Sequence, residues 1–356
     1  MKSKAAEPMS VLSDDPERDW SRPGVYEVDH GLFRVPLPLD QDHLKAVNVY
    51  VLRDESGASL VDSGWVVGTS RELLAAALAA LDLGLADIKR ILVTHLHRDH
   101  YTLGVALRRE FGLTIDLGSG DRASLAAASV VGRPPLEAQR VQMVRCGSPR
   151  LASWIDANAE AETGHDPALW EQPDNWLGSA TTVHVGGRVL EALPTPGHTQ
   201  GHYVFDDAEA NIMFTGDHVL PHITPSIGFE SVLAASPLRD FLQSLTMLRG
   251  RPDRRMLPAH GPTGGSVHER VDALLDHHRA RFNQILSLLQ ARDGAACASE
   301  IAGAMNWTRR ERRLDELDMF NQVLAVAEIE SHLEALVERG ELQRKEDAGV
   351  QHYTRV

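Results

Sequence analysis

The chain of 356 residues has few cysteines and no long apolar segment. Its two cysteines, Cys146 and Cys297, form neither a CxxC nor a CxH pattern, so the sequence offers no disulfide framework and no thiolate metal site. We interpret both as ordinary thiols of a protein in a reducing compartment. No apolar run approaches the ~18 residues of a membrane span, and residues 1–19 lack an apolar segment of the secretory type. We therefore expect a cytoplasmic protein that does not associate with a membrane.

Positive charge is also scarce. The sequence has 36 Lys and Arg against 50 Asp and Glu, a formal net charge of −14, and a pI near 5.6. Nucleic-acid-binding proteins usually present a basic face, so this balance argues against duplex DNA as a partner, although a local basic patch remains compatible with it. Hydrophobic residues make up 43% of the chain, which is ample for a packed core.

One short run concentrates metal-binding side chains. The segment from Thr94 to His100 reads Thr-His-Leu-His-Arg-Asp-His and follows the apolar stretch 91–93, which is typical of a buried strand. Neutral imidazole and carboxylate are ligands that hold zinc or iron. Four such groups buried together without a metal would leave several polar groups unpaired, at roughly 1–3 kcal/mol each. The run therefore predicts a metal site formed by His95, His97, Asp99 and His100.

Further donors are needed to surround a metal, and three other segments supply them. His198 lies in a Pro-Gly turn, Asp217 follows an apolar strand and a glycine, and His260 lies in a Pro-Ala-His-Gly segment after another apolar stretch. Each donor thus follows a predicted strand. A sandwich of two sheets with a site along one rim would require this repeated pattern.

The HxHxDH run, the PGHT turn, the GD turn and the AHG turn, in this order, resemble the metallo-beta-lactamase superfamily. The resemblance extends upstream to Ser59-Leu60-Val61-Asp62-Ser63-Gly64 and covers roughly residues 25–265. It implies an α+β protein with a four-layer αββα sandwich. It also implies one metal bound by His95, His97 and His198, a second bound by Asp99, His100 and His260, and Asp217 as the bridge between them. Asp62 would be a buried hydrogen-bonding residue beside the ligands.

A metal pair of this kind predicts hydrolysis. Two divalent ions can share a hydroxide whose parent water has a pKa lowered towards ~7, and they can polarise the bond under attack. We expect two zinc ions, with iron or manganese as alternatives that the same ligands suit. Asp99 is the candidate catalytic residue, because its second oxygen could hold the attacking hydroxide.

The length predicts one metallo-beta-lactamase domain over 23–265, preceded by a flexible arm over 1–22. A helical insertion is expected at about 120–180, with three of the six tryptophans, Trp154, Trp170 and Trp176. The insertion could form a lid whose tryptophans line a substrate pocket, or the tryptophans could only anchor it on the sandwich. His222 lies on a loop that leaves the site and could contact substrate.

Residues 266–356 predict three helices and a hairpin, which resemble a winged-helix domain. From Asp293 to the C-terminus eight Lys and Arg stand against thirteen Asp and Glu, and the helix over 320–339 carries several glutamates that we place on its surface. Because DNA affinity comes largely from neutralised phosphates, this module is a poor duplex binder. One basic cluster remains: Arg309, Arg310, Arg312 and Arg313. It predicts a salt-bridged loop or a homodimer contact, or a site for an anionic substrate tail such as that of coenzyme A.

The predicted function is hydrolysis of a small acyl compound, with a thioester ahead of a lactone or other ester. Beta-lactamases lack the bridging aspartate that the resemblance assigns to Asp217, which argues against beta-lactam hydrolysis. Cleavage of single-stranded RNA is the alternative that the same metals could drive, and a basic or aromatic track into the pocket would favour it. Diiron oxygen reduction would need a flavin domain for which the chain has no room. A non-enzymatic role, with structural metals and a protein-binding C-terminal module, is the last alternative.

Overall fold

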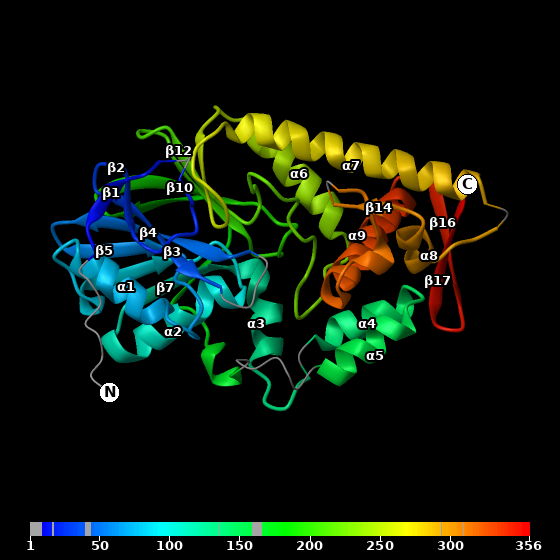
Figure 1. Cartoon of the computed structure of the whole chain (residues 1–356), viewed down its shortest axis with the longest axis horizontal. Helices are drawn as coiled ribbons and strands as arrows, with labels where there is room; N and C mark the ends of the chain where they lie inside the picture. Colours follow the sequence, from blue (N-terminus) through cyan, green and yellow to red (C-terminus); the bar gives the residue numbers. More distant parts are fainter. Residues whose placement is uncertain are drawn as a thin grey trace.

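The computed structural model describes residues 9–15, 18–39, 44–134, 136–158, 166–292, 294–308 and 310–356. Two mixed β-sheets lie face to face at one end of the molecule, and the helices of the C-terminal quarter gather at the other end (Figure 1). The long helix α7, Val267–Gln290, runs along one edge from the sheets to the C-terminal helices.

The first sheet contains eight strands in sequence order. They are β1 Val11–Ser13, β2 Val25–Asp29, β3 Leu32–Pro38, β4 Ala46–Asp54, β5 Gly57–Val61, β6 Ile88–Leu92, β7 Thr114–Gly118 and β8 Asn175–Leu177. Strands β2 to β5 pair antiparallel, whereas β1 with β2 and β5 through β8 pair parallel. The parallel pairs place the C-terminal ends of β5, β6 and β7 at one edge of the sheet, where loops can carry functional side chains.

The second sheet contains five strands in the order β13-β12-β11-β10-β9. They are β9 Thr181–Val185, β10 Arg188–Pro194, β11 Tyr203–Asp207, β12 Ile212–Gly216 and β13 Arg255–Pro258. All neighbours pair antiparallel except β12 and β13, which pair parallel. Because β12 and β13 run in the same direction, the segments that follow them leave the sheet at the same edge.

The remaining elements are mostly helical. They are α1 Ser70–Ala79, α2 Arg98–Phe111, α3 Arg122–Ala128, α4 Glu137–Arg145, α5 Pro149–Asn158, α6 Pro237–Arg249, α8 Ala298–Gly303 and α9 Met319–Glu338, with 3-10 helices η1 Leu85–Asp87, η2 Ser119–Asp121, η4 Pro167–Leu169 and η5 Leu314–Glu316. Two short ribbons, β14 Asn306–Trp307 with β15 Arg312–Arg313 and β16 Leu342–Asp347 with β17 Val350–Arg355, complete the C-terminal region.

Three apolar clusters define the layers. Tyr50 and Leu92 of the first sheet pack with Phe205 and Phe214 of the second sheet, and this cluster fills the space between the sheets. The outer face of the first sheet packs against α1 and α2, and the outer face of the second sheet packs against α6 and α7. The order is helices, sheet, sheet, helices, as the sequence predicted for the metallo-beta-lactamase domain.

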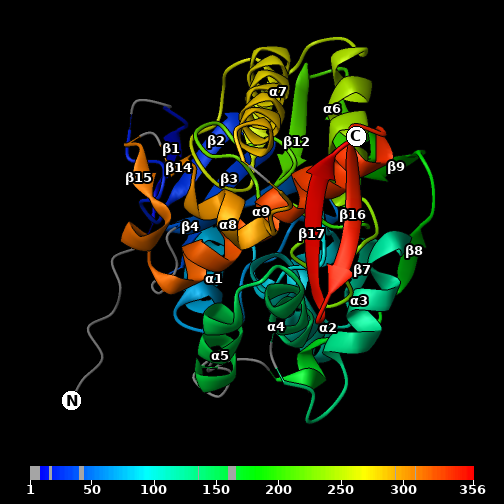
Figure 2. The same cartoon turned by 90° about the vertical axis from the view of Figure 1, so that its right-hand side faces the viewer.

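The C-terminal quarter shares its core with the second sheet. One cluster extends from Met213 of β12 through Phe241 of α6 to Val326 of α9 and Tyr353 of β17. Helices α4 and α5 of the insertion pack against α9 as well, and both views place them beside it (Figure 1, Figure 2). The helices and the hairpin that the sequence predicted for this region are present, and they form a continuous body with the sandwich.

Two details of the sequence analysis need correction. The arm predicted over 1–22 is in part a strand: β1 pairs with β2, and the carboxylate of Asp14 forms a 2.7 Å ion pair with the buried guanidinium of Arg34. Helix α9 exposes Glu338 as expected, but it does not present all of its glutamates to solvent. Glu330 is buried and accepts hydrogen bonds from Gln142 and Arg145 of α4, because this face of α9 is the contact surface for the insertion.

Candidate metal centre

The seven predicted ligands come together at one edge of the two sheets. His95 and His97 lie in the turn between β6 and α2, and Asp99 and His100 lie in the first turn of α2. The second sheet supplies the other three residues, each after a strand end: His198 after β10, Asp217 directly after β12, and His260 after β13. The side chains form two groups, His95, His97, His198 and Asp217 in one and Asp99, His100 and His260 in the other.

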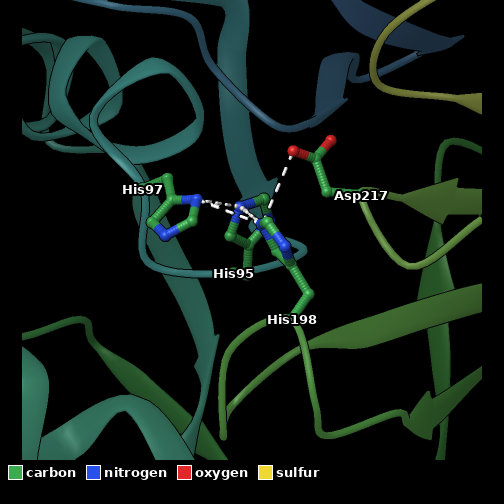
Figure 3. A group of neighbouring side chains, drawn as sticks. All are labelled: His95, His97, His198 and Asp217. Carbon is green, nitrogen blue, oxygen red and sulfur yellow. Dashed lines mark hydrogen bonds and ion pairs between the residues drawn. The ribbon is translucent and has the colours of Figure 1, made fainter. Parts of the chain in front are cut away.

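In the first group three imidazole nitrogens face one another (Figure 3). The distances are 2.9 Å from His95 Nε2 to His97 Nδ1, 3.2 Å from His95 Nε2 to His198 Nε2, and 3.1 Å from His97 Nδ1 to His198 Nε2. A tetrahedral zinc with ~2.0–2.1 Å bonds to nitrogen places its ligand atoms about 3.3 Å apart. The triangle of nitrogens therefore has nearly the size that one such ion requires.

The other ring nitrogens fix which atoms are free to bind. His97 Nε2 donates to the carbonyl oxygen of Phe229 at 2.9 Å, and His198 Nδ1 donates to that of Ser226 at 2.7 Å. In the neutral rings His97 Nδ1 and His198 Nε2 are then without protons, and two such lone pairs 3.1 Å apart cannot hydrogen-bond to each other. A cation between the two nitrogens would remove this repulsion. In metal sites the other ring nitrogen of a ligating histidine usually donates to a carbonyl or carboxylate oxygen, as it does in both rings here.

The second group is built in the same way. His100 Nδ1 donates to Asp62 Oδ2 at 2.9 Å and His260 Nδ1 donates to the carbonyl oxygen of Ala46 at 2.7 Å. Their Nε2 atoms are buried and have no hydrogen-bond partner among the residues that the structure describes. Asp99 Oδ2 lies 3.5 Å from the Nε2 of His100 and 3.4 Å from that of His260. Two nitrogens and one carboxylate oxygen thus converge around a second point.

Asp217 faces both groups with different oxygens. Its Oδ1 lies 3.4 Å from His260 Nε2, and its Oδ2 lies 3.5 Å from His198 Nε2. Its backbone N–H donates to Nε2 of the buried His202, whose other nitrogen bonds to Thr195 at 2.8 Å. The preceding Gly216 has φ +51°, and a Cβ there would lie 2.5 Å from His202 Nε2. The geometry fits the bridging position that the family resemblance implies.

Asp62 does not face the ligand atoms but holds two of the ligand-bearing segments. It adopts φ +60°, and its carboxylate accepts hydrogen bonds from Thr94 N, Thr94 Oγ1 and His100 Nδ1. Thr94 Oγ1 in turn lies 3.0 Å from His95 Nδ1. One buried carboxylate therefore orients a histidine of each group, which agrees with the expected hydrogen-bonding role.

Electrostatics distinguish the two groups. Burial lowers the pKa of His97 to about 3, so this ring is in its neutral, ligating form. Burial also opposes a charge on His100, but Asp99, Asp62 and Asp217 outweigh it and raise its pKa to about 9. Burial disfavours the ionised carboxylates as well, yet His100 and His260 hold the pKa of Asp99 and of Asp217 well below the usual range. The negative field that favours a proton at the second group favours a divalent cation equally.

A metal pair fits this donor set. Among the described residues, three buried atoms of the two groups have no hydrogen-bond partner, namely His100 Nε2 and His260 Nε2 of the second group and Asp217 Oδ1 of the first. Unpaired buried polar atoms are costly, and five imidazoles with two carboxylates are the donors that zinc, iron and manganese accept. The residues define positions for two ions, and they do not discriminate among these metals.

The metal centre opens into a cavity of about 1180 Å³. His97, Asp99, His198 and Asp217 line it, and so does His222, which lies on the exposed loop after β12 as the sequence suggested. Of the three tryptophans of the insertion, only Trp170 lines the cavity, whereas Trp154 packs against the C-terminal core and Trp176 against the first sheet. The insertion does line the cavity, with residues such as Ala128 and Leu136, but its tryptophans do not form a common wall because the three rings lie in different places.

Sequence reasoning missed the other walls of the cavity. The loop 224–232 supplies the carbonyl oxygens of Ser226 and Phe229 to the ligand histidines, and α9 adds Phe320 and Leu324 to the lining. Main-chain oxygens carry no residue-type signal, so no sequence pattern could have identified this loop. The sequence of α9 shows an apolar face, but it does not show which segment of the chain packs against that face.

Comparison with known proteins agrees with this centre. A model of the metallo-beta-lactamase superfamily matches residues 44–260, a segment that includes all seven clustered side chains. The chain therefore belongs to the metallo-beta-lactamase superfamily. Its fold and its His/Asp site are those of a metal-dependent hydrolase of this class.

Individual relatives are more distant. The chain is 31% identical over 108 residues to a beta-lactamase-like protein 2 homolog from Caenorhabditis elegans, a match that covers 30% of this chain and 34% of that protein. It is 30% identical over 165 residues to a hydroxyacylglutathione hydrolase from Haemophilus influenzae, covering 46% and 62%. It is 26% identical over 198 residues to an atrochrysone carboxyl ACP thioesterase from Aspergillus fumigatus, covering 53% and 44%. The chain thus spans less than two thirds of the length of each of these relatives.

Two solved structures match nearly the whole chain. A metallo-beta-lactamase family protein from Thermus thermophilus is 29% identical, with a TM-score of 0.76, and the match covers 93% of this chain and all of that one. A beta-lactamase domain protein from Burkholderia ambifaria is 25% identical, with a TM-score of 0.77 and coverage of 96% and 97%. These matches extend well beyond residues 44–260 and so include the C-terminal region. Among the described residues, no helix is long and apolar enough to cross a membrane.

Proposed function

We propose that this protein is a dinuclear metal hydrolase of an acyl compound, with a thioester as the preferred substrate. The observation that carries the proposal is the position of Asp217, whose two oxygens face two adjacent groups of ligand atoms at the wall of a large cavity. A hydroxyacylglutathione hydrolase and an ACP thioesterase among the relatives support the thioester. Lactones and simple esters are the next candidates.

A metal pair bound here would supply a hydroxide at neutral pH and a Lewis acid for the carbonyl oxygen. The reaction adds water across the acyl bond: the C–S bond of a thioester breaks, and a carboxylate, a thiol and a proton are released. The residues of the chain hold the reactants. Asp99 is ionised and directs Oδ2 to His100 and His260, so its other oxygen can accept a hydrogen bond from the attacking water and orient it. His222 lines the same cavity, and we propose that it contacts the substrate.

The walls of the cavity favour an acyl substrate over RNA. They combine apolar residues such as Leu96, Ile227 and Leu324 with acidic, basic and neutral polar side chains and so form no uniformly basic track, and the C-terminal region contributes part of the lining. Its helices and hairpin follow the order of a winged helix, but α9, which would be the DNA-reading helix, is largely buried against the insertion. We propose that the C-terminal module serves the cavity and does not bind duplex DNA.

The test is hydrolysis by the zinc-loaded protein of a panel of acyl-CoA and glutathione thioesters, lactones and a labelled single-stranded RNA. Asp99→Asn is run in parallel, and Asp156→Asn, on the exposed face of α5, is the matched control. We expect thioester turnover that falls by more than ~10²-fold in Asp99→Asn, as is common for a group that orients the nucleophile, and that stays unchanged in Asp156→Asn.

Other outcomes decide between the alternatives. Cleavage of RNA alone, with the same sensitivity to Asp99→Asn, would replace the acyl substrate by a phosphodiester. If the metal-loaded protein cleaved nothing in the panel and Asp99→Asn left every measured property unchanged, the metals would have a structural role.

A further inference from the structure

The C-terminal region forms one part of the cavity lining. Helix α7 contributes His277 and Arg281, the β14–β15 ribbon contributes Trp307 and Arg312, and α9 contributes Glu328 among others. These residues belong to segments outside the 44–260 match to the superfamily model. A cavity of about 1180 Å³ exceeds the ~300–1,000 Å³ of usual small-ligand pockets. The substrate therefore has room for a long portion on this side.

Three polar side chains in this part of the lining have unused hydrogen-bonding atoms. Arg281 Nε lies 3.6 Å from Glu328 Oε1, and His277 Nε2 lies 3.8 Å from the same oxygen. All three atoms are buried and none has a hydrogen-bond partner. Arg281 itself is 9% exposed and is held in place, since its NH1 donates to the carbonyl oxygen of Asn306 and its guanidinium lies 4.4 Å above the ring of Trp307.

The unused atoms define the chemistry of a ligand. Arg281 Nε can only donate, ionised Glu328 can only accept, and His277 Nε2 can do either. A group that both accepts and donates would satisfy them, whereas a simple anion would be repelled by Glu328. Secondary amides and hydroxyls have this property.

A positive side chain lies beyond this polar group. Arg312 is exposed on β15, lines the cavity and has no ion-pair partner among the described residues. Its neighbour Arg313 forms a 3.5 Å ion pair with Asp315 and does not line the cavity. Of the basic cluster noted in the sequence, Arg309 is outside the described residues, and Arg312 alone of the other three lines the cavity. It can bind an anionic group at the outer end of the same ligand.

We propose that His277, Arg281 and Glu328 bind an amide of the thiol arm of a thioester substrate, and that Arg312 binds the anionic end of that arm. The inference rests on the proposed function, because it concerns the leaving group of the same reaction. Two thiols share this chemistry. Coenzyme A combines amides with phosphates, and glutathione combines amides with carboxylates.

The experiment varies the thiol while the acyl group stays an acetyl group. Ethyl thioacetate has no amide, S-acetyl pantetheine has amides and no charge, and acetyl-CoA and S-acetyl glutathione have amides and an anionic end. We measure kcat and KM for wild type, His277→Ala, Glu328→Gln and Arg312→Ala, with Arg313→Ala as the matched control. Calorimetric binding of S-methyl pantetheine and S-methyl glutathione, which cannot be hydrolysed, is the second readout.

We expect kcat/KM to fall for particular thioesters and not for all of them. His277→Ala and Glu328→Gln should lower kcat/KM about ten-fold for the amide-containing thioesters, mainly through KM, and leave ethyl thioacetate unchanged. Arg312→Ala should weaken only the substrates with an anionic end, and the larger of its effects on acetyl-CoA and S-acetyl glutathione identifies the thiol. Arg313→Ala should have no effect.

Equal losses for every thioester, or no loss for any, would overturn the proposal while leaving the thioesterase function intact. If wild type hydrolysed no thioester, the proposed function would fail instead. The subsite would still stand if S-methyl pantetheine bound and His277→Ala weakened that binding about ten-fold, and it would fall if neither S-methyl compound bound.

Discussion

Two groups of buried histidines in the described part of the chain can be compared, and one of them has the form of a metal site. The first is the metal centre. The second lies between α7 and α9, where His278 Nδ1 lies 3.1 Å from His332 Nε2 and His332 Nδ1 donates to the carbonyl oxygen of Glu328. Both groups are largely buried, so burial and residue type do not distinguish them.

The difference lies in where the second ring nitrogen finds its partner. In the metal centre every such nitrogen has a partner outside the group, for instance the carbonyl oxygen of Phe229 for His97, so the remaining nitrogens converge and are available to an ion. In the second group one histidine is the partner of the other, and their hydrogen bond uses the atoms that would have bound an ion. Histidines define a metal site only when their other nitrogens are bonded elsewhere.

The charged residues around the two groups of histidines also favour a cation in the metal centre and disfavour one in the α7–α9 group. Asp62, Asp99 and Asp217 surround the second half of the metal centre and raise the pKa of His100 to about 9. In the α7–α9 group burial lowers the pKa of His332 to about 4. Glu328 opposes this effect but does not outweigh it, and its carboxylate also forms an ion pair with Arg281. The first site attracts a cation, whereas the second excludes even a proton.

Matched substitutions test this comparison most strongly. His198→Gln removes one of three converging nitrogens, and we expect bound metal to fall from two ions per chain to one or none, with activity reduced by more than ~10²-fold because the bridging geometry is lost. His332→Gln removes an equally buried imidazole and should leave both ions bound. Metal content after dialysis, measured by elemental analysis, gives the answer.

Folding must be checked in both variants, because each leaves a buried polar partner unsatisfied. Circular dichroism and the unfolding midpoint show whether the fold persists. Loss of metal from a folded His332→Gln protein would show that the α7–α9 group contributes to the metal site and would remove the distinction drawn above.

The sequence predicted the ligand set because ligands are side chains at recognisable positions. The order of motifs from His95 to His260 and their places after strands were sufficient, and the structure brings all seven together. The sequence could not predict that Ser226, Phe229 and Ala46 orient the ligands, because main-chain oxygens are common to all residues. It also could not place α9: Glu330 looks solvent-exposed until its partner Gln142, almost two hundred positions away, is known.

Stability as a function of pH provides a smaller and more specific test. The pKa of His332 is about 4 in the folded protein, below the ~6.5 of an unfolded chain, so the unfolded state binds more protons between these values. The contribution of neutral His332 is complete above pH 6.5 and is lost as the pH falls towards 4, which amounts to about 2 kcal/mol by pH 5. The charged and titratable groups that face it are Glu328, Arg281, His277 and His278.

Urea unfolding at pH 7.5 and pH 5.0, for wild type and His332→Gln with saturating metal, isolates this residue. Loss of metal at low pH affects both proteins and cancels in the difference between them. Wild type should lose about 2 kcal/mol more than the variant between the two pH values. An identical loss in both proteins would show that His332 has an ordinary pKa and that the α7–α9 group tolerates charge.

The smallest expected effect connects the two regions. The ring of Phe320 on α9 meets that of Phe229 edge to face at 5.7 Å, and the carbonyl oxygen of Phe229 orients His97. Such a ring pair contributes about 0.5–1.5 kcal/mol, so Phe320→Ala should weaken metal retention by roughly ten-fold or less. Leu324→Ala, on the same cavity-lining helix, is the control. Titration with a competing chelator measures both variants. If both variants weakened metal retention equally, the cause would be a general loosening of α9. Weaker retention in Phe320→Ala alone would show that the C-terminal region helps to position a metal ligand through the loop 224–232.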